Sequence, residues 1–100
     1  MTGPEPYKIR PWGEYLATRN LARRIRLQIE ESRPLGAPIV LDFAGVIAAT
    51  RGFLDSLICP LVEIGYPVTV VGADEALRHD LAVMQARGKV VRFDVRGPGR

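Results

Sequence analysis

Short runs of apolar and β-branched residues alternate with segments of helical periodicity along this chain, and this alternation is its most constraining feature. Residues 38–45 begin with near-continuous apolar positions, residues 68–71 are all apolar or β-branched, and residues 89–95 start the same way before they alternate. Continuous apolar runs of this length are typical of strands that are buried on both faces of a parallel sheet. The sequence therefore predicts three such strands, with the last one at an edge of the sheet.

Helical segments precede and separate these strands. Residues 18–32, about 52–64 and about 74–87 place apolar side chains at intervals of three and four, which is the spacing of one helix face. Thr18 is the expected N-cap of the first helix. Pro60 lies deep in the second helix, where a proline removes a backbone donor and predicts a kink or a break. Strands joined by helices at this spacing imply an α/β fold, with a largely parallel sheet of roughly four to five strands covered by about three helices.

One domain accounts for the chain. Its 100 residues are 47% hydrophobic and 25% charged, as in an average globular domain. Residues 7–15 mix apolar side chains with Pro11 and Gly13, which suits a short edge strand followed by a turn. Residues 1–6 and 96–100 are rich in proline and glycine and are expected to be mobile tails, so the predicted domain covers residues 7–95.

The sequence also indicates where the protein works. No apolar run reaches the roughly 18–20 residues that span a bilayer, and the first residues lack the apolar core of a secretion signal. Cys59 is the only cysteine, so the chain can form neither an internal disulfide nor a cysteine-based zinc site. We therefore expect a soluble, cytoplasmic protein without membrane association.

Common catalytic signatures are absent. The sequence contains no GxGxxG, GxxxxGK[ST], HExxH, CxxC or GxSxG pattern. His79, the only histidine, falls on the side of its helix opposite Leu77 and Leu81 and is expected to be solvated. These features predict a non-enzymatic protein with no cofactor, no metal site and no catalytic residue.

Two stretches resemble the STAS and STAS-like domains of bacteria. Residues 40–46, V-L-D-F-A-G-V, and then F-L-D at 53–55, look like the motif in which a strand ending in D-F-x-G-V runs into a loop and a helix. Residues 13–19 and 22–24 are similar to the STAS-like family of unknown function, and the resemblance covers most of residues 13–65. It implies a single STAS-like domain that regulates by binding a protein partner, with a kinase-like ATPase as the first candidate.

The loop after this strand departs from the anti-sigma factor antagonists, which are relatives of STAS-like domains by fold. In those proteins the loop carries an Asp-Ser-Ser/Thr-Gly motif, and a partner kinase phosphorylates its first serine. Counting from Asp42, the aspartate, the acceptor serine and the next hydroxyl fall on Thr50, Arg51 and Gly52. Arginine cannot accept phosphate, and Thr50 is the nearest hydroxyl. We therefore expect no phosphorylation switch.

Residues 48–56, which are this loop and the start of the second helix, are the candidate binding surface. The candidate residues for a partner or an anion are Asp42, Thr50, Arg51, Gly52 and Asp55. Arg51 and the first amides of the helix suit an anion, which makes an anion- or nucleotide-binding domain the alternative function. Two structural interpretations compete with this one. Asp55 can satisfy the helix end from the first turn, and Asp42 can bond to the amides that follow it in a turn.

The basic excess of the chain, a net charge of +3, raises nucleic acid as a third possible partner. Arg19, Arg23 and Arg26 recur at helical spacing and form a basic stripe, and Glu30 can pair with Arg26 across one turn. No aromatic residues interleave with this stripe, as they do on platforms that stack bases. We therefore expect a solvated helix face and not a nucleic-acid groove. Trp12 is expected to anchor the N-terminal segment in the core.

Overall fold

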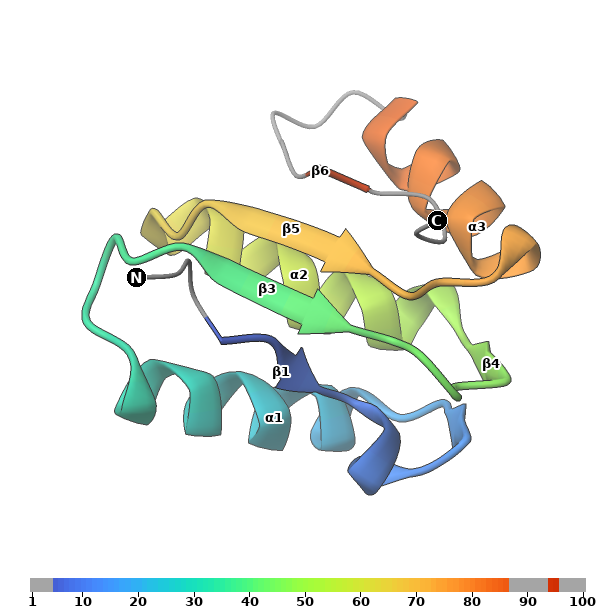
Figure 1. Ribbon diagram of the computed structural model, residues 1–100, viewed down its shortest axis with the longest axis horizontal. Coiled ribbons are helices and arrows are strands. Elements are labelled where there is room, and N and C mark those ends of the chain that lie inside the picture. The colour runs from blue at the N-terminus through green and yellow to red at the C-terminus, as the bar shows by residue number, and fades with distance from the viewer. Residues whose placement is uncertain (1–4, 87–93, 96–100) are drawn as a thin grey trace.

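The computed structural model describes residues 5–86 and 94–95, and it has the α/β fold that the sequence predicts (Figure 1). Residues 1–4 of the expected N-terminal tail (1–6) and the whole expected C-terminal tail (96–100) lie outside the described residues, as do residues 87–93 of the last predicted strand and helix end. The elements in chain order are β1 (Tyr7–Lys8), the 3-10 turn η1 (Arg10–Trp12), β2 (Tyr15–Leu16), α1 (Arg19–Ser32), β3 (Ile39–Asp42), β4 (Ala48–Ala49), α2 (Arg51–Ile64), β5 (Val68–Val71), α3 (Glu75–Ala86) and β6 (Asp94–Val95).

The described strands form two parallel sheets. The larger one has four strands in the order β1-β3-β5-β6, with β1 at an edge as predicted. The smaller one pairs β2 with β4 and was not predicted. In Figure 1, β4 lies beyond the carboxyl ends of β3 and β5. The small pair therefore sits at the end of the main sheet where its strands run into loops.

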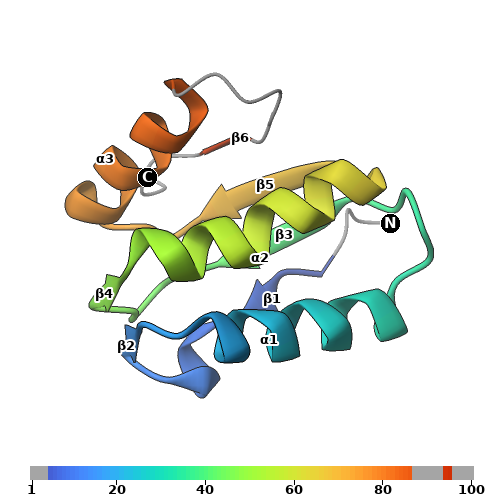
Figure 2. The same cartoon turned by 180° about the vertical axis from the view of Figure 1, so that it is seen from behind.

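The helices gather on one face of the main sheet. The strand order never reverses, so every right-handed crossover steps in the same direction and leaves its helix on the same side. Figure 2 shows α1 and α2 side by side on that side, and α3 also contacts α2. Val40 and Val71, whose side chains belong to the other face, are only half-buried. The expectation that the central strands are buried on both faces is therefore wrong, because the order of the connections places the described helices on a single face.

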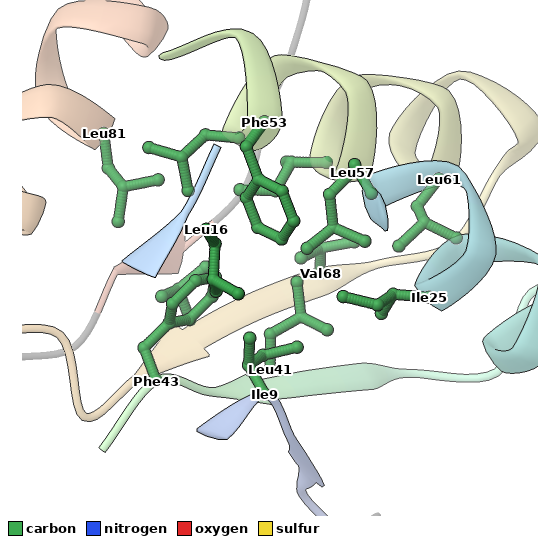
Figure 3. Close-up of a cluster of buried hydrophobic side chains, with 14 of the residues drawn as sticks. Ile9, Leu16, Ile25, Leu41, Phe43, Phe53, Leu57, Leu61, Val68 and Leu81 are labelled. Atoms are coloured by element: carbon green, nitrogen blue, oxygen red, sulfur yellow. The ribbon is translucent and has the colours of Figure 1, made fainter. Parts of the chain in front are cut away.

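The core lies between the sheet and these helices (Figure 3). Phe53 is fully buried there, and no polar or charged side chain is buried among the described residues. The labelled core residues are Ile9, Leu16, Ile25, Leu41, Phe43, Phe53, Leu57, Leu61, Val68 and Leu81. Trp12 packs against this core, as expected, and the guanidinium of Arg24 lies 5.8 Å from the centre of its ring.

Helix α2 runs through Pro60. It is continuous from Arg51 to Ile64, so the break predicted near Cys59 is absent. An interior proline costs roughly 3 kcal/mol, whereas each large apolar side chain that is fully buried contributes about 1.5–3 kcal/mol. Leu57 and Leu61, on either side of the proline, are both fully buried. Tertiary packing of the two flanking turns therefore holds the helix together.

Candidate functional site

The β2–β4 pair holds the two segments that lead into α1 and α2 against each other. The carbonyl of Glu14 accepts hydrogen bonds from the amides of Ile47 and Ala48, at 2.8 and 3.0 Å. The amide of Thr50 donates to the carbonyl of Leu16 at 2.9 Å. The first turns of α1 and α2 are thereby brought to the same end of the molecule (Figure 2).

Thr50 is the N-cap of α2. Its Oγ1 accepts a hydrogen bond from the amide of Phe53 at 3.1 Å, and its hydroxyl donates to the carbonyl of Ala17 at 3.2 Å. The second bond ties the start of α2 to the segment before α1. Thr18 caps α1 in the same way, as predicted, by accepting from the amide of Leu21. The hydroxyl of Thr50 is therefore engaged both as donor and as acceptor.

Asp55 does not satisfy the end of this helix, so that expectation is wrong. The helix begins at Arg51 behind the Thr50 cap, which places Asp55 in the second turn. Its side chain is exposed, and its Oδ1 accepts a hydrogen bond from the thiol of Cys59 at 3.0 Å. The apolar spacing predicts a helix start one residue later, at Gly52, and does not mark Thr50 as the cap.

Asp42 is engaged in the turn after β3, as the structural interpretation of this residue predicts. Its Oδ1 accepts a hydrogen bond from the amide of Ala44 at 2.9 Å. Gly72, at the end of β5, fits closely against the same turn, because a Cβ on it would lie 2.5 Å from Oδ1 of Asp42. Open α/β sheets form their ligand crevice where the strand order reverses, and the order of the described strands does not reverse.

Two arginines from different helices flank Gly52. Arg51 is exposed, and its Nε lies 3.9 Å from Oδ1 of Asp80 in α3. A Cβ built on Gly52 would lie 3.6 Å from Nε of Arg19, so the Arg19 side chain reaches across to the start of α2. Arg19 and Arg51 are each the first residue of a helix, and neither first turn contains an acidic residue. This is the reverse of the usual preference, because the positive end of the helix dipole favours carboxylates.

The basic stripe does not act as one solvated face. Arg26 forms an ion pair with Glu30 at 2.9 Å, as predicted, but its side chain is only 20% exposed. Arg23 is exposed, and Arg19 lies beside Gly52. The expectation of a solvated stripe is therefore correct for Arg19 and Arg23 and wrong for Arg26.

Two large exposed apolar residues that the sequence pattern does not mark lie close in the chain to the candidate surface. Tyr15 in β2 is 68% exposed, and Ile47, directly before β4, is 51% exposed. Neither residue belongs to a periodic apolar segment, which is the only signal in the sequence that could have marked them. We call Tyr15, Arg19, Ile47, Ala48 and Arg51 the docking surface.

The described residues also limit what else the site contains. Within residues 5–86 and 94–95, no group of three or more histidine, cysteine, aspartate or glutamate side chains is placed to hold a metal ion. In the same part of the chain, no helix combines the length and the apolar character needed to cross a membrane. His79 is exposed, as expected.

Comparisons with protein-family models, with curated proteins and with solved structures found no match to this chain. The resemblance to STAS-like domains therefore rests on the sequence motifs at residues 13–24, 40–46 and 53–55.

Proposed function

We propose that this protein is a non-enzymatic regulatory module that acts by binding another protein through the docking surface and residues 48–56. The observation that carries the proposal is the exposure of Tyr15 in β2 and of Ile47 directly before β4, at the small sheet whose strand β4 leads into α2. Large aromatic and aliphatic side chains lose water favourably when a partner covers them, and such side chains dominate the binding energy of many interfaces.

The motif resemblance supports the same surface. In this fold the D-F-x-G-V stretch begins at Asp42, the last residue of β3, and continues through the loop that leads by way of β4 into α2, which is the order of elements that the STAS-like motif implies. A kinase-like ATPase is the partner that this resemblance favours. Because the hydroxyl of Thr50 is engaged at the helix cap, we propose that binding does not depend on phosphorylation of this loop.

An anion- or nucleotide-binding domain is the second candidate function. The approach of Arg19 to Gly52 favours it, because a second guanidinium lies beside the exposed amides at the start of α2. Two observations favour the protein-binding function instead. Asp80 already lies near Arg51, and the described strands offer no switch-point crevice for a nucleotide.

Site-specific crosslinking tests the protein-binding proposal. The photoreactive residue p-benzoylphenylalanine would replace Ala48 on the docking surface and, in a matched control, Leu35, which is 70% exposed in the turn after α1. We expect position 48 to crosslink one defined protein in the native host and position 35 not to do so. That protein would then be purified and titrated against the wild-type chain and a Tyr15→Ser variant, and equal affinity for both would contradict the proposal.

Calorimetric titration with ATP and GTP separates the two candidates. A pure protein-binding module should release no measurable heat with either nucleotide. Micromolar binding that is lost in an Arg51→Ala variant would replace the proposed function with the nucleotide-binding one.

A further inference from the structure

We propose that the docking surface binds an acidic protein segment that also carries apolar side chains. This inference rests on the proposed function and adds the chemistry of the partner. It follows from the charges near Tyr15 and Ile47, because Arg19 and Arg51, the first residues of α1 and α2, each lie four positions after one of these two residues.

The docking surface itself contains two arginines and no acidic residue. Glu14, the acidic residue nearest in sequence to Tyr15, is already paired with Arg10 at 2.8 Å. Asp80 lies within ion-pair distance of Arg51, at 3.9 Å. In the described part of the chain, no carboxylate lies within ion-pair distance of Arg19. A partner that brings carboxylates would therefore meet a cation without an internal ion pair.

The two helix starts strengthen this preference. Arg19 and Arg51 stand at the positive ends of their helix dipoles, where cations are disfavoured and carboxylates are favoured. Local arrangements that work against stability in this way are expected at functional positions. Carboxylates from a partner would relieve this repulsion on binding, which an uncharged or basic segment cannot do.

The exposed apolar residues define the second requirement. Tyr15 and Ile47 are not covered by the rest of the described chain, so a segment with acidic groups alone would leave them in water. A typical interface buries apolar side chains at its centre and keeps charges at its rim. The segment that fits this surface therefore combines aspartate or glutamate with leucine, isoleucine or an aromatic residue.

Selection from a peptide library tests the inference without knowledge of the natural partner. A phage-displayed library of random peptides of roughly 12 residues would be panned against the folded chain, and the enriched peptides would be synthesised and titrated by fluorescence anisotropy. We expect an excess of acidic residues together with apolar ones. Binding should weaken by about tenfold or more in Arg19→Glu and in Arg51→Glu.

Matched controls separate charge at the surface from charge in general. Lys8→Glu changes the net charge equally at an exposed position in β1 and should leave the affinity within about twofold of wild type. Leu35→Ser is the control for Tyr15→Ser, which should abolish binding. Because glutamate is favoured in the first turn of a helix and Arg19 has no ion pair among the described residues, Arg19→Glu should melt no lower than wild type, so a loss of affinity in it cannot come from unfolding. Arg51→Glu brings a second carboxylate near Asp80, so its affinity is compared only at temperatures at which its own melt shows it folded.

The possible outcomes distinguish this inference from the proposed function. Enriched peptides that depend on Tyr15 but carry no acidic excess, or that tolerate both arginine variants, would overturn the acidic partner and leave the docking surface standing. The acidic partner and the docking surface would both be overturned if the enriched peptides bound the Tyr15, Arg19 and Arg51 variants as tightly as wild type. A library without enrichment would have the same consequence. If an RNA oligonucleotide bound the chain and its affinity fell as much as that of the peptides in Arg19→Glu and Arg51→Glu, the surface would be assigned to nucleic acid and the inference overturned.

Discussion

The contact between Gly72 and the turn after β3 is the tightest backbone approach at any glycine of the described chain, and replacing this glycine tests it directly. Gly72 has φ of +76°, and a Cβ there would lie 2.7 Å from the amide nitrogen of Ala44 as well as 2.5 Å from Oδ1 of Asp42. Gly36 has a similar φ of +87°, but no atom lies within 4 Å of its Cβ position. The pair therefore separates backbone strain from steric contact.

Gly72→Ala should destabilise the protein far more than Gly36→Ala. A residue with a Cβ costs about 1–2 kcal/mol in the left-handed region, and this cost applies at both positions. At Gly72 the overlap adds about 1–3 kcal/mol, and loss of the hydrogen bond from Ala44 to Asp42 adds about 1 kcal/mol. We expect a total of about 3–6 kcal/mol for Gly72→Ala, a large part of the roughly 5–15 kcal/mol that stabilises a small domain.

Urea unfolding followed by circular dichroism measures this difference. Because one kcal/mol lowers the Tm of a domain of this size by roughly 4–8 °C, thermal melts should show a gap of more than about 8 °C between the two variants. Equal losses in both variants would show that backbone conformation alone requires Gly72. A Gly72→Ala variant as stable as wild type would show that the end of β5 does not pack on the turn after β3.

Substitutions at four further positions and one titration test the interpretation of α2 and the stripe. Phe53→Ala should lower the free energy of unfolding by about 3–5 kcal/mol, whereas Asp55→Ala should lower it by at most about 1 kcal/mol, because only Phe53 is buried. If the helix were rotated, thermal melts would show Asp55→Ala as the less stable of the two variants. Thr50→Ala should cost about 1 kcal/mol in urea unfolding and Thr50→Ser much less, since serine keeps the cap, and intact-mass spectra of the natively expressed chain should show no phosphate on this residue. Gly52→Ala should stabilise the chain by up to about 1 kcal/mol, because its Cβ would meet Arg19 at an ordinary contact distance of 3.6 Å; a lower melting temperature would contradict that geometry. Duplex DNA should not bind the basic stripe at low salt. Measurable binding whose constant falls with salt, with a slope of log K against log salt of roughly −2 to −3, would refute this expectation.

Much of the fold could be predicted because its signals are local. Thr18 caps α1 through an atom three residues away, and Asp42 bonds to the amide two residues away, so both roles can be inferred from neighbouring letters. The apolar spacing of the three helices and the apolar runs of β3 and β5 are local in the same sense. The α/β class and the parallel sheet follow from the order of these segments.

Tertiary structure alone decided the surface on which the proposals rest. The β2–β4 pair has two residues in each strand, too few for a periodic pattern, and its partners are 33 positions apart, so nothing in the sequence indicated that Arg19 and Gly52 would meet. The order of the strands placed the described helices on one face of the sheet, although the apolar residues of β3 suit a strand covered on both sides. The continuity of α2 through Pro60 likewise comes from packing. The local sequence determines which backbone conformation a segment prefers. Which segments pack against each other depends on the total burial of apolar surface, to which every element contributes at once.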